Sequence, residues 1–107
     1  MIIQIYAFTR IDQAVEAAEM GVDQIGFVAG DYGLVSGELS FAAACRLAHS
    51  LPPHTVRVAL TMATQVDEIL HMAEAVEPDV VHISTDLEDV GVADLQRLRR
   101  RLPASIR

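Results

Sequence analysis

The sequence contains no lysine, and all eight of its basic residues are arginines. Without a lysine amine, the chain cannot form a Schiff base with a carbonyl substrate. A single cysteine, Cys45, excludes an internal disulfide and fits a reducing compartment. No apolar run approaches the roughly 20 residues of a membrane-spanning helix, and no basic segment precedes the apolar start of the chain. These absences predict a cytoplasmic protein.

Acidic side chains outnumber basic ones, with 15 Asp and Glu against 8 Arg and a net charge of -7. Nucleic acids and anionic membrane surfaces would be repelled by this field, so neither is expected as a partner. Most of the arginines crowd the C-terminus: Arg97, Arg99, Arg100, Arg101 and Arg107. They either bind a phosphate or complement the dipole at the end of a helix.

An apolar, strand-like run followed by an amphipathic helical segment occurs four times along the chain. The strand-like runs cover residues 24–28, 56–60, 79–84 and, at the N-terminus, 2–6. Strands that alternate with helices are typical of a parallel α/β fold. Because a complete (β/α)8 barrel needs roughly 200 to 250 residues, four units amount to half of one. We expect residues 1–107 to form a single (β/α)4 half-barrel domain that is part of a larger barrel or assembly.

Capping residues and apolar stripes predict where the helices lie. The first helix should start after Thr9, with Asp12 as the acidic partner in a capping-box-like pair, and end at Gly21. The second should start at Ser36 and turn Leu39 toward the core.

The remaining helices are expected at residues 66–76, capped by Thr64, and at 92–101. Residues 103–107 resemble the beginning of a fifth strand, as if the sequence stopped inside a periodic pattern. The longest loop, residues 29–35, is rich in glycine and is a candidate for ligand binding.

Neither a metal site nor a nucleotide cofactor is predicted. No His-x-x-x-His or Cys-His spacing connects Cys45 with the four histidines, which are His49, His54, His71 and His82. His82, on the fourth predicted strand, is interpreted as a hydrogen-bonded structural residue. The glycine and lysine motifs that hold nucleotide phosphates do not occur.

Three charged residues follow predicted strands, where parallel α/β folds place their chemistry. They are Arg10, Asp31 and Asp86. Each could bind or move charge. Solvated capping roles explain Arg10 and Asp86 equally well, because Arg10 opens a helix and Asp86 precedes one.

Several segments resemble a known family in register. Residues 4–10, with their Thr-Arg pair, and 14–28, with Gly-Phe-Val at the end, are similar to the first strand, helix and second strand of phosphoribosylanthranilate isomerase. This family is the (β/α)8 barrel enzyme of tryptophan synthesis. The match continues at residues 57–58, 68–69 and 79–81, and it corresponds to the N-terminal half of the family's barrel.

The resemblance implies an Amadori rearrangement, in which a ribosylamine ring opens and a proton shifts to give an amino-ketose. The family uses a cysteine general base at the end of the first strand and an aspartate general acid from a later strand. Tyr6 stands at the cysteine position here, and Ala7 replaces the following glycine. A tyrosine, whose ordinary pKa is near 10, is a poor base at neutral pH.

Other departures from the family fall in its substrate loops. A shorter stretch, residues 30–34, replaces the Ser-Pro-Arg element, and residues 82–85 replace Gln-Leu-His-Gly. The family's acid and phosphate-binding loops lie in the second half of its barrel, beyond the match. The resemblance implies no cofactor and a phosphorylated sugar as substrate.

Our site prediction for this chain is Tyr6 and Asp86 as catalytic residues, with substrate bound by Arg10, Asp31 and Ser84. As an isolated chain we expect it to be inactive in the family's reaction.

Two further hypotheses stay open. The half-barrel could be non-catalytic and serve binding or assembly, because four parallel strands leave two unpaired edges that self-association or a complementary half-barrel would cover. Alternatively, the four units could form a flavodoxin-like sheet with helices on both faces.

Overall fold

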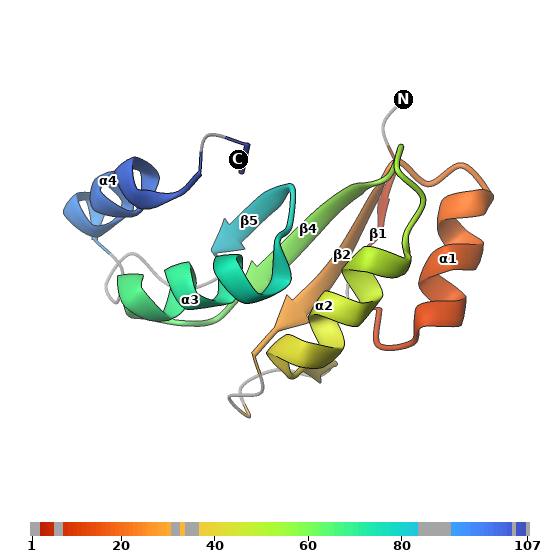
Figure 1. Ribbon diagram of the computed structural model, residues 1–107, viewed down its shortest axis with the longest axis horizontal. Helices are drawn as coiled ribbons and strands as arrows, with labels where there is room; N and C mark the ends of the chain where they lie inside the picture. Colours follow the sequence, from red (N-terminus) through yellow and green to blue (C-terminus); the bar gives the residue numbers. More distant parts are fainter. Residues whose placement is uncertain are drawn as a thin grey trace.

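Strands and helices alternate along the chain, as predicted (Figure 1). The computed structural model describes residues 3–5, 8–30, 33, 37–83, 91–103 and 105–106. The strands are β1 (Gln4–Ile5), β2 (Gln24–Ala29), β3 (Glu38–Leu39), β4 (Val56–Thr61) and β5 (Val80–Ile83). The helices are α1 (Ile11–Glu19), α2 (Phe41–Ser50), α3 (Val66–Val76) and α4 (Val92–Arg101).

Every pair of strands in the sheet is parallel, in the order β1, β2, β4, β5. β4 pairs with β2 from Gln24 to Val28 and occupies one of its edges. The other edge is shared, since β1 pairs with Gln24 and Ile25 at the start of β2 and β3 with Val28 and Ala29 at its end. β3 was not predicted, because two residues are too few to show a periodic pattern.

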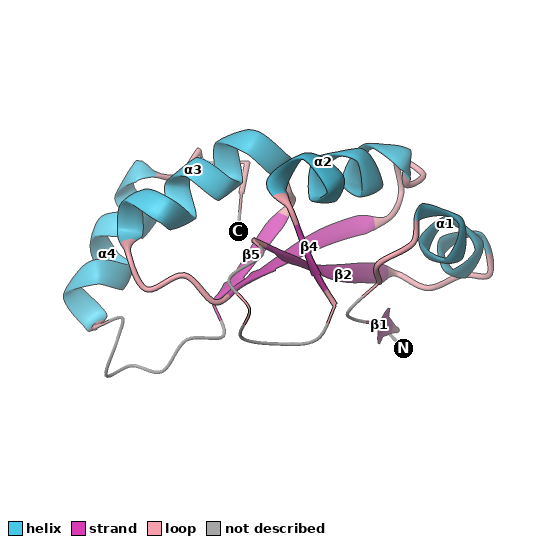
Figure 2. Cartoon of the chain, turned by 90° about the horizontal axis from the view of Figure 1, so that it is seen from below, coloured by secondary structure: helices cyan, strands magenta, loops and turns pink. Residues whose placement is uncertain are grey.

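All four helices lie on the same side of the sheet (Figure 2). A flavodoxin-like sheet needs helices on both faces, so that alternative is wrong for the described part of the chain. Parallel strands with one outer layer of helices are the arrangement of a (β/α) barrel wall. The predicted parallel (β/α)4 half-barrel is confirmed.

The larger part of the core fills the space between β2 and the first two helices. Side chains of a strand point alternately to its two faces, and Ile25, Phe27 and Ala29 point to the helices. They pack against Ala14 of α1 and Leu47 of α2, and all five are at most 1% exposed.

A second, smaller cluster joins α3 to α4. Ile69 of α3 and Leu98 of α4 are buried in it, with Ile83 at its margin. Leu95 and Leu102, which lie near Leu98, are half-buried. The apolar face of α4 is therefore incompletely covered.

The predicted start of the second helix is wrong. α2 begins at Phe41, and Leu39 lies in β3, where its carbonyl accepts a hydrogen bond of 2.7 Å from the Gly30 N–H. The backbone of Gly37 has φ +81°, a left-handed conformation that a right-handed helix cannot contain. The side chain of Ser40 caps α2 by accepting from the Ala43 N–H at 3.2 Å.

Two other predicted helix caps and the predicted fifth strand are also not found. α1 is preceded by Arg10 and α3 by Gln65, and neither start has a side-chain cap, so Thr9 and Thr64 do not cap. Among the described residues of the last segment, Ser105 lies in a turn and no strand begins. The end of α1 at Gly21, with φ +102°, follows the prediction.

Arg57 links three elements at the amino-terminal edge of the sheet. Its guanidinium donates to the carbonyl oxygens of Ala48 (2.7 Å) and Leu51 (3.2 Å), at the end of α2. It also lies 3.4 Å from the carboxylate of Asp79, which precedes β5. With its side chain only 20% exposed, Arg57 adds a charged donor to the end of α2, where the Ala48 carbonyl also accepts from the Leu51 N–H at 3.4 Å.

The same pair of hydrogen bonds, between an aspartate and the backbone of a neighbouring segment, occurs twice at this edge. The Asp79 carboxylate accepts from the Arg57 N–H at 2.9 Å, and the Asp79 N–H donates to the Arg57 carbonyl at 3.0 Å. Asp23 makes the same two contacts with Ile3: its carboxylate accepts from the Ile3 N–H at 2.8 Å, and its N–H donates to the Ile3 carbonyl at 3.0 Å. Each aspartate therefore fixes the strand it precedes to a neighbouring strand.

We expect Arg57→Ala to lower the free energy of unfolding by about 2 to 4 kcal/mol, because it removes charge-assisted hydrogen bonds and leaves Asp79 without its cation. Urea unfolding would measure the change. The control is Arg97→Ala, which breaks an exposed pair with Asp94 (3.0 Å) and should cost less than about 1 kcal/mol. Equal losses in the two variants would contradict a structural role for Arg57.

Ser40→Ala should lower the free energy of unfolding by about 1 kcal/mol, since it removes the side-chain cap of α2. Thr9→Ala is the matched control: it alters an exposed residue that caps nothing and should change stability by less than about 0.5 kcal/mol. Thermal or urea unfolding of the two variants would compare them. A larger loss for Thr9→Ala would reverse the assignment of the caps.

Candidate functional site

The carboxyl ends of the strands lie along one edge of the sheet, because all the strands are parallel. In the sequence, Tyr6 follows the end of β1 directly, Ser84 follows the end of β5, and Asp31 comes two residues after β2. Tyr6, Asp31, Ser84 and Asp86 lie outside the described residues. Their roles therefore stay predictions.

Arg10 is the predicted site residue that the structure describes, and it forms an ion pair. Its Nε and Nη2 donate to the two carboxylate oxygens of Asp12 at 3.1 and 2.9 Å. Both side chains are 65% exposed. The hydrogen bond from Arg10 is the main cause that holds the pKa of the Asp12 carboxyl below its ordinary value. Arg10 therefore already has an anionic partner, in the first turn of the helix that it precedes.

A cleft of about 330 Å³ lies beside this pair, between the start of α1 and α2. Its lining includes Arg10, Asp12, Leu39 and Arg46. Arg46 was not singled out from the sequence, because an isolated arginine on a helix is ordinary surface. Two cations and one carboxylate give the cleft a weak attraction for anions. They supply neither a nucleophile nor a base that titrates near neutral pH.

Cys45 and His49 form a pair that sequence reasoning missed, and the statement that no Cys-His spacing exists was wrong. They are four residues apart on α2, so they lie on the same face of the helix. The Cys45 Sγ is 3.3 Å from His49 Nδ1, which also lies 2.8 Å from the Cys45 carbonyl oxygen. Two ligands are too few for a structural metal site. Within the described residues, no group of three His, Cys, Asp or Glu side chains could hold a metal ion.

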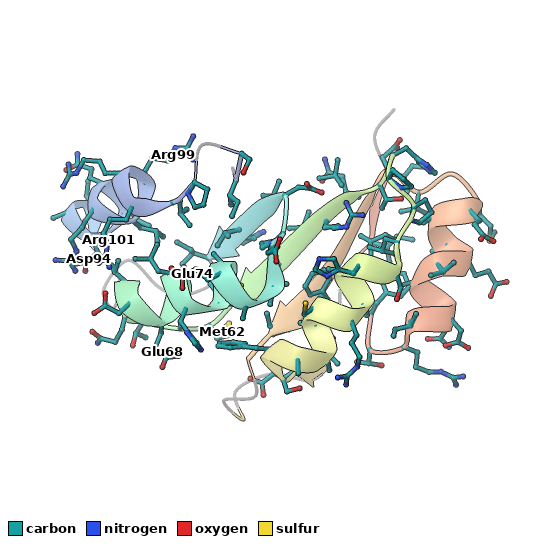
Figure 3. The ribbon with its side chains drawn as sticks, in the orientation of Figure 1. Met62, Glu68, Glu74, Asp94, Arg99 and Arg101 are labelled. Carbon is teal, nitrogen blue, oxygen red and sulfur yellow. The ribbon has the colours of Figure 1, made fainter. Side chains whose placement is uncertain are left out.

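Three of the four arginines of α4, which are Arg97, Arg99 and Arg101, make intramolecular contacts. Arg101 pairs with Asp67 of α3 at 3.0 Å, and Arg99 donates to the Ile106 carbonyl at 2.7 Å. Figure 3 shows Arg99 and Arg101 on opposite sides of the helix. Three arginines of this cluster stand in the last turn of α4, where cations complement the helix dipole. These contacts favour the structural interpretation over the phosphate-binding one.

His82 lies in β5 and is exposed. It points to the face of the sheet opposite the helices, since its neighbours Val81 and Ile83 face the helices.

No described helix is both long enough and apolar enough to cross a membrane.

A parallel sheet with four helices on one side defines a half of a TIM-type barrel. The sequence is 33% identical to a curated N-(5'-phosphoribosyl)anthranilate isomerase from Natronomonas pharaonis over 85 residues, which are 79% of this chain and 39% of that protein. No family profile matches the chain.

Solved structures agree with this comparison. The phosphoribosylanthranilate isomerase of Thermotoga maritima matches with a TM-score of 0.76 and 24% identity, over 95% of this chain and 48% of that chain. The enzyme of Thermus thermophilus gives 0.71 and 25%, over 92% and 48%. The chain thus spans about half the length of these relatives or less. It resembles one half of the phosphoribosylanthranilate isomerase barrel, and the resemblance expected from the sequence is confirmed.

Arg10→Ala should raise the pKa of the Asp12 carboxyl toward its ordinary value, because it removes the hydrogen bond that lowers it. Titration of the carboxyl carbons by NMR would measure this. Because the folded-state pKa is depressed, any stabilisation from the pair is present above the unfolded-state pKa and is lost as the pH falls through the folded-state value. Arg46→Ala, in the same cleft, is the control and should leave the Asp12 pKa low. A shift in the control as large as in Arg10→Ala would contradict the assignment.

Proposed function

We propose that this chain is a segment of a phosphoribosylanthranilate isomerase-like barrel. By resemblance it belongs to the intramolecular aldose-ketose isomerases of tryptophan biosynthesis, which carry out an Amadori rearrangement. The observation that carries the proposal is the match of nearly the whole chain to half of a solved isomerase at a TM-score of 0.76. The curated relative, at 33% identity, bears the same name.

The proposed site lies at the carboxyl ends of the strands. Tyr6 stands where the family has its general base and Asp86 is the candidate acid, while Arg10, Asp31 and Ser84 would contact substrate. A phenol with an ordinary pKa near 10 is almost entirely protonated at neutral pH, so it accepts a proton poorly. The family's own acid lies in the other half of its barrel. We therefore propose that the isolated chain is divergent or inactive in this reaction.

The proposed substrate is a phosphorylated sugar or a similar small metabolite, with no cofactor. One solved phosphoribosylanthranilate isomerase is in complex with reduced 1-(o-carboxyphenylamino)-1-deoxyribulose 5-phosphate. A biosynthetic role of this kind, together with the single cysteine, supports a cytoplasmic location.

The second candidate function is that of a non-catalytic half-barrel for binding or assembly. The incompletely covered face of α4 and the apolar residues on the side of the sheet without helices favour it. Among these residues Val56, Leu60 and Val80 are only half-buried, whereas Val28 and Val58 are already buried. One solved structure is of monomers generated from the dimeric phosphoribosylanthranilate isomerase of Thermotoga maritima. Both functions require the edges of the sheet to be covered.

The test of the isomerase proposal replaces the matched half of the Thermotoga maritima enzyme with this chain and measures turnover of phosphoribosylanthranilate. Tyr6→Cys should raise turnover about 100-fold over the unaltered fusion, because it restores a group that ionises near neutral pH. Asp86→Asn should lower turnover in that background.

Tyr6→Phe is the matched control, since it keeps the ring and should give no gain. Binding of the reduced phosphate analogue, measured by calorimetry, would show that each fusion has a formed site. Equal turnover in Tyr6→Cys, Tyr6→Phe and Asp86→Asn fusions that bind the analogue would refute the site assignment.

A further inference from the structure

An apolar cavity of about 160 Å³ lies at the β5 edge of the sheet, beneath α4. Val81 and Ile83 of β5 line one side of it, and the other side is lined by Leu95, Leu98 and Leu102 together with Arg99. α4 extends beyond β5 (Figure 2), and no described strand pairs with the outer edge of β5. This edge therefore has room for one more strand with apolar side chains turned toward the helix.

The opposite edge, at β1, carries side chains of that kind. Ile3 and Ile5 are 43% and 41% exposed. Ile5 pairs with Ile25, whose side chain faces the helices, so Ile5 and Ile3 lie on the helix side of the sheet as well. No described helix covers them at this edge. One edge thus has an apolar cavity under a helix, and the other has apolar side chains without a helix.

We propose that two copies of this chain close into a two-fold symmetric barrel, in which β5 of each copy pairs in parallel with β1 of the other. α4 of one copy then covers Ile3 and Ile5 of its partner, and these side chains fill the cavity against Val81 and Ile83. The inference rests on the half-barrel of the proposed function and is independent of the isomerase chemistry.

Strand direction and register agree with this closure. A two-fold axis along the barrel keeps every strand parallel. Gln4 of β1 lies beside Gln24 of β2, which lies beside Val56 of β4. Val58, two residues further along β4, lies beside Val80 of β5. A line drawn across the sheet from Gln4 therefore reaches position 78. In an eight-stranded barrel with a shear of 8, half the barrel adds an offset of about four residues. The offset places Gln4 of the partner beside position 82.

The resulting neighbours are Ile3 with Val81 and Ile5 with Ile83. Both pairs turn their side chains toward the helices, as the cavity requires. A slip by one residue would turn them to the other face, so the apolar pattern selects this register.

Charge also favours a second copy over another partner. Closure brings α4 next to α1 of the partner. α4 contains four arginines and one aspartate, whereas α1 contains Asp12, Glu16 and Glu19 and no basic residue. Although the whole chain has a net charge of -7 and several of these side chains also pair within the chain, the two helices carry opposite net charges, which favours their approach. The interior of the closed barrel would also bury Leu60, Val56 and Val80, which are only partly buried in the single chain.

The test is a disulfide across the proposed seam, in a background with Cys45→Ala. Ile5→Cys and Ile83→Cys are combined in one chain, the protein is oxidised, and its mass is measured on a denaturing gel and by light scattering. Within one chain these positions are separated by three strand spacings, roughly 14 Å, which is too far for a disulfide. Directly opposed residues on neighbouring strands are close enough. We expect a closed, cross-linked dimer of twice the 11.6 kDa chain.

The matched control combines Ile11→Cys with Ile83→Cys. Ile11 is 40% exposed, nearly as much as Ile5, but it lies beside the cleft between α1 and α2. This pair should cross-link at least tenfold more slowly. A second measurement uses Ile5→Arg, which should shift the unmodified dimer to monomer at tens of micromolar, while Ile11→Arg should not.

Three outcomes would overturn the inference: an unaltered chain that is monomeric at tens of micromolar, a ladder of cross-linked polymers instead of a closed dimer, or equal cross-linking in the control. None of these readouts uses turnover. Loss of the dimer with turnover intact in the fusion would reject this inference alone, and loss of turnover with the dimer intact would reject the isomerase proposal alone.

Discussion

The constraint on which this structure depends is that a parallel sheet has to be covered on both faces. Its strands are joined by helical crossovers, and here all four helices lie on one side. The other side carries valines and a leucine from β2, β4 and β5, and the described chain provides no second layer for it. A barrel solves this problem because closure turns that face into an interior. The exposed Ile3 and Ile5 at the β1 edge and the cavity under α4 also indicate that the sheet needs a further layer or strand to be covered.

The two ends of the strands have different tasks. At the amino-terminal end, Asp23 and Asp79 each form one side-chain and one backbone hydrogen bond with the backbone of the neighbouring segment. Arg57 adds carbonyls at the end of α2 to this network. These contacts are structural, because the donors and acceptors that form them have their partners within the chain. The predicted site residues follow the carboxyl ends of the strands in the sequence. Such a division between a stabilising and a functional end is a general property of (β/α) barrels, and it allows the site to diverge while the scaffold is retained.

Much of the scaffold could be predicted from local pattern. The helices at residues 66–76 and 92–101 were placed correctly because their apolar stripes repeat over about three turns. The second helix was misplaced because Leu39 fits a helical stripe as well as it fits β3, and the pairing of β3 with β2 decides between them. The caps Thr9 and Thr64 were wrong by one residue, which is within the ordinary uncertainty of helix ends. The link between Arg57 and Asp79, 22 residues apart, has no sequence signal, since only the parallel pairing of β4 and β5 brings the two together.

The sequence by itself determined the class of fold, the number of strand-helix units and the likeness to phosphoribosylanthranilate isomerase, because each depends on residues close together in the chain. The resemblance also predicts that Tyr6 stands at the position of the family's catalytic cysteine. The tertiary structure decided that the helices share one side of the sheet and that three of the four arginines of α4 form contacts within the chain. It also showed which apolar residues the edges leave uncovered. Those properties depend on contacts between segments far apart in the sequence, and a stripe on one helix does not specify what it packs against.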